Sequence, residues 1–448
     1  MSASYDEVAY PSVPLGQTQP DRMAVIAHLR GLEPADPQMA RVLEIGCSDA
    51  GNLAALAAYA PDAAFVGIDL SAAAVARAQD AVAALPNLTV VQADLRDFDQ
   101  GGFDYVIAHG VYSWIPRPQD LLECVARNLA PRGIAYISYD VKPGAHLRTM
   151  VAEMLLRESS GIADARNLLR VVEKAEAAGK YAEILRAVAR RTSAKPDYVL
   201  LHDELAAEHH PVFFDEFAAR ASEVGLGYLG EAHLADFARP VADAPTGEIE
   251  REQWWDYVSN RTFRQSLWTR DAAGPIDAEA LGELWLAAPA QHLQTRSQQS
   301  RLRLLRDVEV SVDQATRDDL LRLGAAWPGC VQASDLKTDP AAWLQMLAAR
   351  AIEVRYRPVP CVRPGAAPRV VDYMREQAAA DGLVTTARHE TLRLEDELSR
   401  TAVSLMDGQT TRAQIADELR VRADDRVRSD LDALIESLGQ SGLFVANP

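Results

Sequence analysis

The chain of 448 residues carries 46 lysine and arginine residues against 64 aspartate and glutamate residues, a formal net charge of −18. This balance repels a phosphate backbone, so we expect no nucleic-acid partner. No apolar run is long enough to cross a bilayer, and the start MSASYDEVAYPS lacks the basic and apolar regions of a secretory signal. We therefore expect a protein of two or three domains that stays in the cytoplasm and does not insert into a membrane.

The four cysteines are scattered, and none forms a CxxC pair or lies near a histidine at the spacing of metal ligands. The adjacent histidines His209 and His210 point apart on either a helix or a strand, which disfavours a shared metal ion. We expect neither a disulfide framework nor a metal site. The cysteines are Cys47, Cys124, Cys330 and Cys361.

Residues 41–140 alternate short runs rich in β-branched residues with alanine-rich runs of helical pattern. This alternation is typical of a parallel sheet whose strands are connected by crossover helices. We therefore predict an α/β fold with a Rossmann-like, doubly wound sheet. The expected strands are Arg41–Ile45, Ala64–Asp69, Leu88–Asp94, Phe103–His109 and Gly133–Asp140. The expected helices are Asn52–Tyr59, Ala72–Ala84 with Ser71 as its N-cap, and Gln119–Leu129.

The rest of the chain has mainly helical patterns. We place the first domain at residues 1–240, with an N-terminal lid at 1–35, a helical insertion at about 146–200, and GYLGEAHL as a further strand of the sheet. A helical middle domain at 241–355 includes EQWWDYVSNRTFRQSLW, whose aromatic residues recur at roughly helical spacing. A small helical, winged-helix-like domain occupies 356–448. Linkers rich in proline and glycine mark both boundaries.

Acidic residues stand at the ends of three successive predicted strands: Glu44 in VLEIGCSDAGNL, Asp69 in GIDLS and Asp94 in VVQADLRDF. Such strand ends meet at one edge of a parallel sheet, where a carboxylate can accept both ribose hydroxyls of a nucleotide-bearing cofactor. Gly46 lets such a ligand approach the backbone closely. Ser48 replaces the middle glycine of the GxGxxG pattern that a pyrophosphate needs, which argues against NAD. The set predicts a cofactor site of another kind.

These strand ends resemble those of class I S-adenosylmethionine (SAM)-dependent methyltransferases. IAHGVYSWIP after the fourth strand and AYISYDVKPG in the fifth are similar to segments of a bacterial family that joins this catalytic domain to a methyltransferase regulatory domain. YDEVAYPSVPLGQTQPDRM, HDELAAEHHPVFFDEFAARASEVGLGYLGEA and EQWWDYVSNRTFRQSLW resemble further blocks of that family. The likeness covers most of residues 4–270 and, more weakly, the tail. Studied members include rickettsial lysine methyltransferases that act on outer-membrane proteins.

The resemblance implies SAM as the cofactor and assigns contacts to it. Glu44 belongs to the cofactor set as the first of the three acids. The other implied contacts are Gly46, Cys47 and Ser48 at the methionine part, Asp69 followed by Leu70 at the ribose, Asp94 with Leu95 at the adenine, His109 beside the cofactor, and Tyr10 and Thr18 in a segment that closes over it.

Methyl transfer from a sulfonium is an in-line displacement that needs an aligned acceptor and no covalent enzyme nucleophile. An amine acceptor must first lose its proton, for which a carboxylate helps, and aromatic faces can hold its cation. The candidates for an acceptor pocket are therefore Tyr112, Trp114, Tyr139 and Asp140, where Asp140 is either the general base or a cap of the segment that follows it. The chain departs from the family at Gln19, where a histidine is expected, and at Ala145. Because both changes are expected near the acceptor pocket, the family resemblance predicts the type of reaction better than it predicts the identity of the acceptor.

The leading expectation is a SAM-dependent methyltransferase that modifies protein lysine side chains. Its partner is then a protein or peptide methyl acceptor, and a homodimer is compatible with the sequence. An alternative is a methyltransferase that acts on a small molecule or a peptide natural product, including carboxylate O-methylation. A third hypothesis, of another class, is a SAM-binding regulatory or interaction protein without transfer activity.

Overall fold

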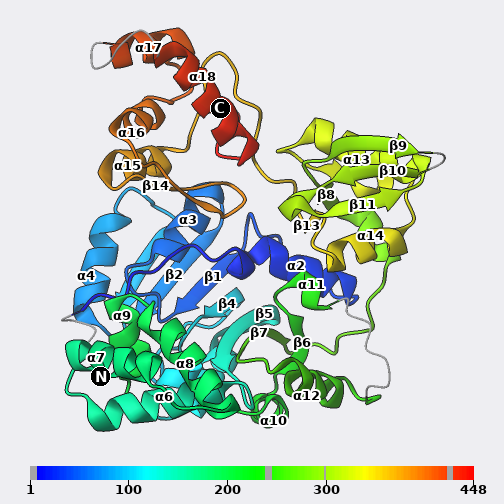
Figure 1. Cartoon of the computed structure of the whole chain (residues 1–448). Helices are drawn as coiled ribbons and strands as arrows, with labels where there is room; N and C mark the ends of the chain where they lie inside the picture. Colours follow the sequence, from blue (N-terminus) through cyan, green and yellow to red (C-terminus); the bar gives the residue numbers. More distant parts are fainter. Residues whose placement is uncertain (1–7, 238–244, 297–298, 421–426, 448) are drawn as a thin grey trace.

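The computed structural model describes residues 8–237, 245–296, 299–420 and 427–447. A seven-stranded sheet with the order β3-β2-β1-β4-β5-β7-β6 forms its centre (Figure 1). Strands β1 to β5 are parallel, which confirms the predicted doubly wound sheet, and β7 runs antiparallel to both β5 and β6. The strands are β1 (Arg41–Ile45), β2 (Ala64–Asp69), β3 (Leu88–Gln92), β4 (Phe103–Ala108), β5 (Leu129–Asp140), β6 (Gly227–Glu231) and β7 (Phe263–Thr269).

Helices cover both faces of the sheet, as the crossover connections of a parallel sheet require. Helices α2, α3 and α4 pack on one face in one buried apolar cluster, and α5 and α10 pack on the other face in a second cluster. Ser71 caps α4 as predicted, because its hydroxyl accepts a hydrogen bond from the amide of Ala74 at 3.1 Å. These helices are α2 (Pro20–Leu29), α3 (Gly51–Tyr59), α4 (Ala72–Ala81), α5 (Pro118–Asn128) and α10 (Phe214–Glu223).

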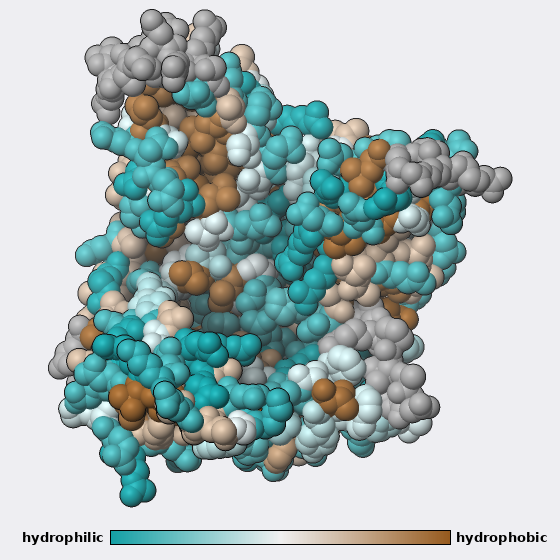
Figure 2. Space-filling model, in the orientation of Figure 1, coloured by the Kyte–Doolittle hydropathy of each residue, from teal (hydrophilic) through white to brown (hydrophobic). Residues whose placement is uncertain are grey.

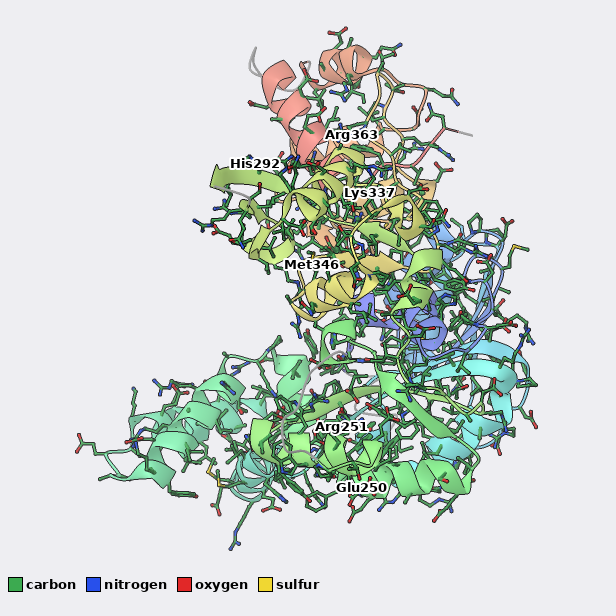
Figure 3. All side chains as sticks on the ribbon, turned by 90° about the vertical axis from the view of Figure 1, so that its right-hand side faces the viewer. Glu250, Arg251, His292, Lys337, Met346 and Arg363 are labelled. Atoms are coloured by element: carbon green, nitrogen blue, oxygen red, sulfur yellow. The ribbon has the colours of Figure 1, made fainter. Side chains whose placement is uncertain are left out.

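The predicted helical insertion follows β5 and forms a body with a small apolar core of its own. It consists of α6 (Ala145–Glu158), α7 (Ile162–Lys174) and α8 (Lys180–Ser193), and it projects sideways from the rest of the molecule (Figure 3). A short helix α9 (Asp197–Val199) and a π-helical turn η3 (Leu200–Glu204) lead back toward the sheet. Turns of the π type are rare and are frequent at functional sites, so the end of the insertion is of interest.

The segment EQWWDYVSNRTFRQSLW is not one helix, contrary to the prediction. Helix α12 (Glu248–Ser259) ends at Asn260, which adopts a left-handed conformation with φ of 50°, and β7 begins three residues later. Strand β7 pairs along its whole length with β5 and fills the position between β5 and β6. This tertiary pairing overrides the local helical spacing of the aromatic residues. The sheet is therefore completed by residues beyond the expected domain boundary at residue 240.

The middle part of the chain, expected to be helical, combines helices with two three-stranded sheets. In Figure 3 it lies above α12, with Lys337 and Met346 labelled on it and Glu250 and Arg251 on α12. Its strands are only two to six residues long, and in so short a run the patterns of helix and strand are hard to tell apart. The elements are β8 (Trp285–Ala287), β9 (Gln291–Arg296), β10 (Gln299–Arg303), β11 (Glu309–Val312), α13 (Gln314–Ala326), β12 (Val331–Gln332), α14 (Pro340–Ala348) and β13 (Glu353–Arg355).

The C-terminal part is a small helical unit with one hairpin, and it packs against α3 of the sheet domain through an apolar cluster that includes Ala55. Figure 2 shows a hollow between this part, the middle part and the insertion. Among the described residues, no helix combines the length and the apolar character needed to span a bilayer. The elements are α15 (Asp372–Ala380), β14 (Leu383–Thr385), β15 (Thr391–Arg393), α16 (Glu397–Ser404), α17 (Arg412–Arg420) and α18 (Val427–Gln440). Shorter helical turns are η1 (Gly16–Thr18), η2 (Tyr112–Trp114), α11 (Leu234–Phe237), η4 (Glu279–Glu283), η5 (Leu305–Asp307) and η6 (Ala333–Asp335).

Candidate functional site

A cavity of about 810 Å³ lies where the ends of the parallel strands face the helical insertion. The loops after β1, β2 and β3, with His109 after β4, form one wall. Trp114, Asp140, α6, α8 and the turn after them form the other. In open α/β sheets ligands bind at this edge. Most of the residues predicted for the cofactor and the acceptor line this cavity. They are Tyr10, Gly46, Ser48, Asp69, Leu70, Asp94, Leu95, His109, Trp114 and Asp140.

The loop between β1 and α3 is held in a conformation that suits a close backbone approach. Gly46 has a φ of +75°, and a Cβ atom placed on it would lie only 2.7 Å from Cγ2 of Val111. Ser48 also has a positive φ, and its hydroxyl donates to the carbonyl of Tyr10 at 2.6 Å. The N-terminal segment is thereby fastened to the loop, so that Tyr10 reaches the cavity.

Asp69 fixes this loop from the end of β2. Its Oδ2 accepts a hydrogen bond from the amide of Ser48 at 2.9 Å, and its Oδ1 accepts one from the amide of Ser71 at 2.9 Å. A carboxylate oxygen can accept two hydrogen bonds, so each oxygen keeps the capacity for a ribose hydroxyl. Asp69 can thus order the loop and hold a diol at the same time.

Asp94 lies at the cavity in a tight pair with Arg96. The Nε of Arg96 donates to both carboxylate oxygens at 3.0 and 3.1 Å, and the backbone amide of Arg96 donates at 2.9 Å. These bonds lower the pKa of Asp94 and keep it ionised. Next to the pair, Leu70 and Leu95 give this end of the cavity an apolar surface that suits a flat ring.

His109 follows β4 and lines the cavity in its neutral form. Its Nδ1 lies 2.9 Å from Oη of Tyr136 and 3.3 Å from Oγ of Ser138. Burial lowers the pKa of His109 to about 4, so the ring carries no charge near neutral pH. A neutral ring at this position does not repel a cationic ligand.

Glu44, Cys47 and Tyr112 do not line the cavity, in contrast to the expectation for all three. The thiol of Cys47 points into the core, where a Cβ on Gly67 would lie 2.8 Å from its sulfur, so only its backbone belongs to the loop. The ring of Tyr112 packs against the ring of Phe217, with 4.7 Å between the ring centres, in the apolar core on the sheet face that α5 and α10 cover. The helical turn η2 directs Tyr112 inward and Trp114 toward the cavity.

Glu44 is buried beneath the loop rather than exposed in the cavity. Its Oε1 accepts a hydrogen bond from Nδ2 of Asn52 at 3.0 Å, whereas its Oε2 has no hydrogen-bond partner among the described residues. Burial raises the pKa of Glu44 to about 8. A buried carboxyl oxygen without a partner is costly, and a donor from a ligand would satisfy it.

Charged and aromatic side chains from distant segments form the wall opposite the loop. Oδ2 of Asp140 lies 2.7 Å from Nε2 of His209 and 2.9 Å from Nη1 of Arg148. The ring of Trp114 stacks on His209 at 4.8 Å, and the guanidinium of Arg148 lies 4.8 Å from the centre of the same ring. The carboxylate of Asp140 therefore already has two partners at hydrogen-bond distance, His209 and Arg148, which weakens the expectation that it acts as a base.

Asp203, in the π-helical turn, also lines the cavity, and sequence reasoning did not identify it. Its Oδ2 lies 3.5 Å from Nη2 of Arg148, and burial raises the pKa of Asp203 to about 6. The neighbouring Glu204 is fully buried and pairs with Arg148 at 3.1 Å and with Lys195. The run HDELAAEHH, dense in acids and histidines, was the available sequence signal for this wall.

The expected departures from the family lie at different distances from the cavity. Ala145 begins α6 directly after Gly144, which lines the cavity. Gln19 does not line it: its Oε1 accepts hydrogen bonds from Nη1 of Arg355 at 2.7 Å and Nε of Arg22 at 3.2 Å, at the contact with the middle part. Thr18, expected to close over the cofactor, is also buried away from the cavity. In the part of the chain that the structure describes, no cluster of three or more potential ligands could hold a metal ion.

Three segments of the chain match described protein families. Residues 43–135 match a methyltransferase domain, and residues 196–270 match a predicted methyltransferase regulatory domain. Residues 367–429 match the C-terminal winged helix domain of PKMT, in agreement with the predicted winged-helix-like character of this part.

Among curated proteins, the chain is 34% identical to the uncharacterized protein RP789 of Rickettsia prowazekii (strain Madrid E) over 288 residues, which are 59% of this chain and 52% of that protein. It is 31% identical to the uncharacterized protein RP028 of the same organism over 235 residues, 49% of this chain and 94% of that protein. The chain thus spans about half the length of RP789. Among solved structures, PKMT2 from Rickettsia typhi, also solved in complex with AdoHcy, shares the fold with a TM-score of 0.84 at 20% identity, covering 98% of this chain and 100% of that one.

Proposed function

Because the chain belongs to the family of SAM-dependent methyltransferases that carry a methyltransferase regulatory domain and a winged helix domain, we propose that it transfers methyl groups from SAM to lysine side chains of a protein acceptor. The observation that carries this proposal is the cavity itself. It joins a loop-and-carboxylate wall, suited to a nucleoside cofactor, to a wall where Asp203 and the ring of Trp114 can receive an amine.

The residues at the strand ends fit SAM. Asp69 would hold the ribose hydroxyls, Asp94 and Leu95 the adenine, and the loop at Gly46 the methionine part, where a Cβ atom would occupy the space. The unsatisfied oxygen of Glu44 beneath this loop suits a donor at the methionine end, directly or through a water molecule. When bound, SAM supplies an electrophilic methyl group on a sulfonium.

The opposite wall would receive and deprotonate the acceptor. Trp114 lines the cavity beside the place for the lysine chain, and the carboxylate of Asp203 offers a hydrogen-bond acceptor to its ammonium group. Asp203 suits the role of proton acceptor better than Asp140, because Asp140 is held by His209 and Arg148 at hydrogen-bond distance. Asp140 would then position Arg148 and the ring of His209 under Trp114. Alignment of the amine with the methyl group would supply most of the acceleration.

The test is incubation of the full-length protein with methyl-labelled SAM and a lysate of its host, followed by mass spectrometry of labelled species. We expect label on protein lysines that is lost in Asp69→Ala, which removes the carboxylate at the cavity. Asp62→Ala, at an exposed acid that precedes β2 at the opposite edge of the sheet and outside the cavity, serves as the control and should retain the label.

Two other outcomes would overturn the proposal. Label only on small molecules or on peptide carboxylates would favour carboxylate O-methylation, for which the basic side chains of Arg148, Arg191 and Lys195 on the same wall offer a binding surface. Tight binding of SAM with no label on any acceptor would favour a SAM-binding regulatory or interaction protein.

The setting of the reaction is part of the same proposal. We place it in the cytoplasm, where thiols stay reduced, and the four cysteines are all free. A net charge of −18 disfavours a nucleic-acid acceptor. A homodimer remains compatible with the chain, and sedimentation of the purified protein would decide it.

A further inference from the structure

We propose that the hairpin of the C-terminal part belongs to the cofactor site: His389, in the turn between β14 and β15, positions Asn52 and, through it, Glu44 beneath the loop after β1. This inference rests on the proposed function, since it assigns a role in binding SAM. His389 is a positioning residue, because it reaches the cavity only through its neighbours.

The hairpin brings His389 into a buried place against the sheet domain. His389 is 4% exposed, and its backbone amide donates to the carbonyl of Thr386 at 2.8 Å. Its Nε2 lies 3.0 Å from Oδ1 of Asn52, a residue 337 positions earlier in the chain. The hydroxyl of Tyr59, at the end of α3, donates to the carbonyl of Thr385 at 2.7 Å and anchors the same hairpin. The contact is thus built from both ends of α3.

Asn52 is the point where three segments meet. Its Nδ2 donates to Oε1 of Glu44 at 3.0 Å and to Oγ1 of Thr18 at 3.1 Å, and its Oδ1 accepts from the backbone amide of Leu15 at 3.0 Å. The side chain is 1% exposed and follows directly on the glycine loop. A single amide therefore links the first strand, the N-terminal segment and the C-terminal hairpin.

The chemistry of this contact has one consistent assignment. Because the backbone amide of Leu15 can only donate, the atom of Asn52 that it faces is Oδ1, and this same oxygen faces His389 and accepts from it. Burial and the nearby guanidinium groups of Arg22 and Arg355 lower the pKa of His389 to about 3, so the ring is neutral and Nε2 carries its hydrogen. The donor from His389 holds the amide of Asn52 in the orientation that keeps Glu44 in place.

The test compares His389→Ala with His389→Gln in the full chain. The Gln amide can donate from nearly the same place as Nε2, and both variants share the left-handed backbone of this residue, with φ of 64°, so they differ mainly in the donor. We expect His389→Ala to weaken SAM binding about tenfold, measured by calorimetry, and to raise KM for SAM with little change in kcat. His389→Gln should recover most of the affinity. Glu390→Ala, in the same turn, is the control and should bind like the wild type.

A double-mutant cycle with Asn52→Ala separates positioning from general destabilisation. If His389 acts through Asn52, the loss caused by His389→Ala disappears when Asn52 is already alanine. Equal SAM affinity of the wild type and His389→Ala, or additive losses in the cycle, would overturn the inference and leave the proposed function standing. No binding of SAM by the wild type would instead overturn the proposed function.

Discussion

Substitution of Gly46 by alanine tests the cofactor site at its narrowest point. The residue has a φ of +75°, and the added Cβ would lie 2.7 Å from Cγ2 of Val111, which lines the same cavity. Carbon atoms in van der Waals contact stand about 3.5 to 4.0 Å apart. Relief of the clash therefore requires Val111 or the loop to move by roughly 1 Å at the place where the methionine part would lie.

Two costs of this substitution can be separated. The left-handed backbone alone costs about 1 kcal/mol or somewhat more for a residue with a Cβ. Gly31→Ala carries the same cost without the clash, because Gly31 has a φ of +78° and nothing lies within 4 Å of its added Cβ. The clash is specific to Gly46, and a misplacement of about 1 Å near the reacting groups can reduce turnover about a hundredfold.

Thermal melting and calorimetry with SAM distinguish the two variants. Gly31→Ala should lower the melting temperature slightly, and Gly46→Ala should lower it further because of its clash with Val111. Only Gly46→Ala should lose SAM affinity, by at least tenfold. The double variant Gly46→Ala with Val111→Ala should regain part of that affinity. Wild-type SAM affinity in Gly46→Ala would show that the loop does not approach the cofactor and would refute the placement.

Three further predictions concern charged groups. Arg264→Met should lower the free energy of unfolding in urea by about 3–5 kcal/mol, because the buried carboxylates of Glu231 and Asp256 then share Arg261 as their remaining cationic partner. A loss below about 1 kcal/mol would contradict this. In the folded state without SAM, the pKa of Glu44 is raised from 4.5 to about 8, so the folded protein holds this proton at pH values where the unfolded chain has lost it. The free energy of unfolding should therefore fall as the pH rises from about 4.5 to 8, by up to about 1.4 kcal/mol per pH unit. This slope should be missing from Glu44→Gln in denaturant titrations across that range, and an unchanged slope would count against it. The rate of methyl transfer should rise through about pH 6, where Asp203 loses its proton, and Asp203→Asn should lack that limb, whereas an identical pH–rate profile would remove Asp203 from the role of base.

Local patterns were sufficient for the first five strands. Alternating apolar runs and helical connections placed β1 and β2 at their observed ends, because a parallel sheet buries each strand on both faces and so marks it clearly in the chain. The acids at successive strand ends could also be located, and Asp69 and Asp94 line the cavity. Their position follows from the rule that the ends of parallel strands share one edge.

The direction in which a side chain points and the contacts between distant segments could not be predicted from local sequence patterns. Glu44 turns beneath the loop and Tyr112 into the core, because the neighbours that bury them come from elsewhere in the chain. The aromatic residues that lead into β7 recur at helical spacing, yet β7 pairs with the free edge of β5 and becomes part of the sheet.

The sequence by itself determined the five parallel strands, their crossover helices, the loop after β1 and the resemblance to methyltransferases, because each of these depends on residues within short stretches of chain. The tertiary structure alone decided the wall that faces the loop, since Asp203 and Arg148 meet Trp114 only after the insertion folds back. It also decided the contact of His389 with Asn52 across 337 positions. Side chains so far apart in the sequence are brought together by packing of whole domains, which no local periodicity records.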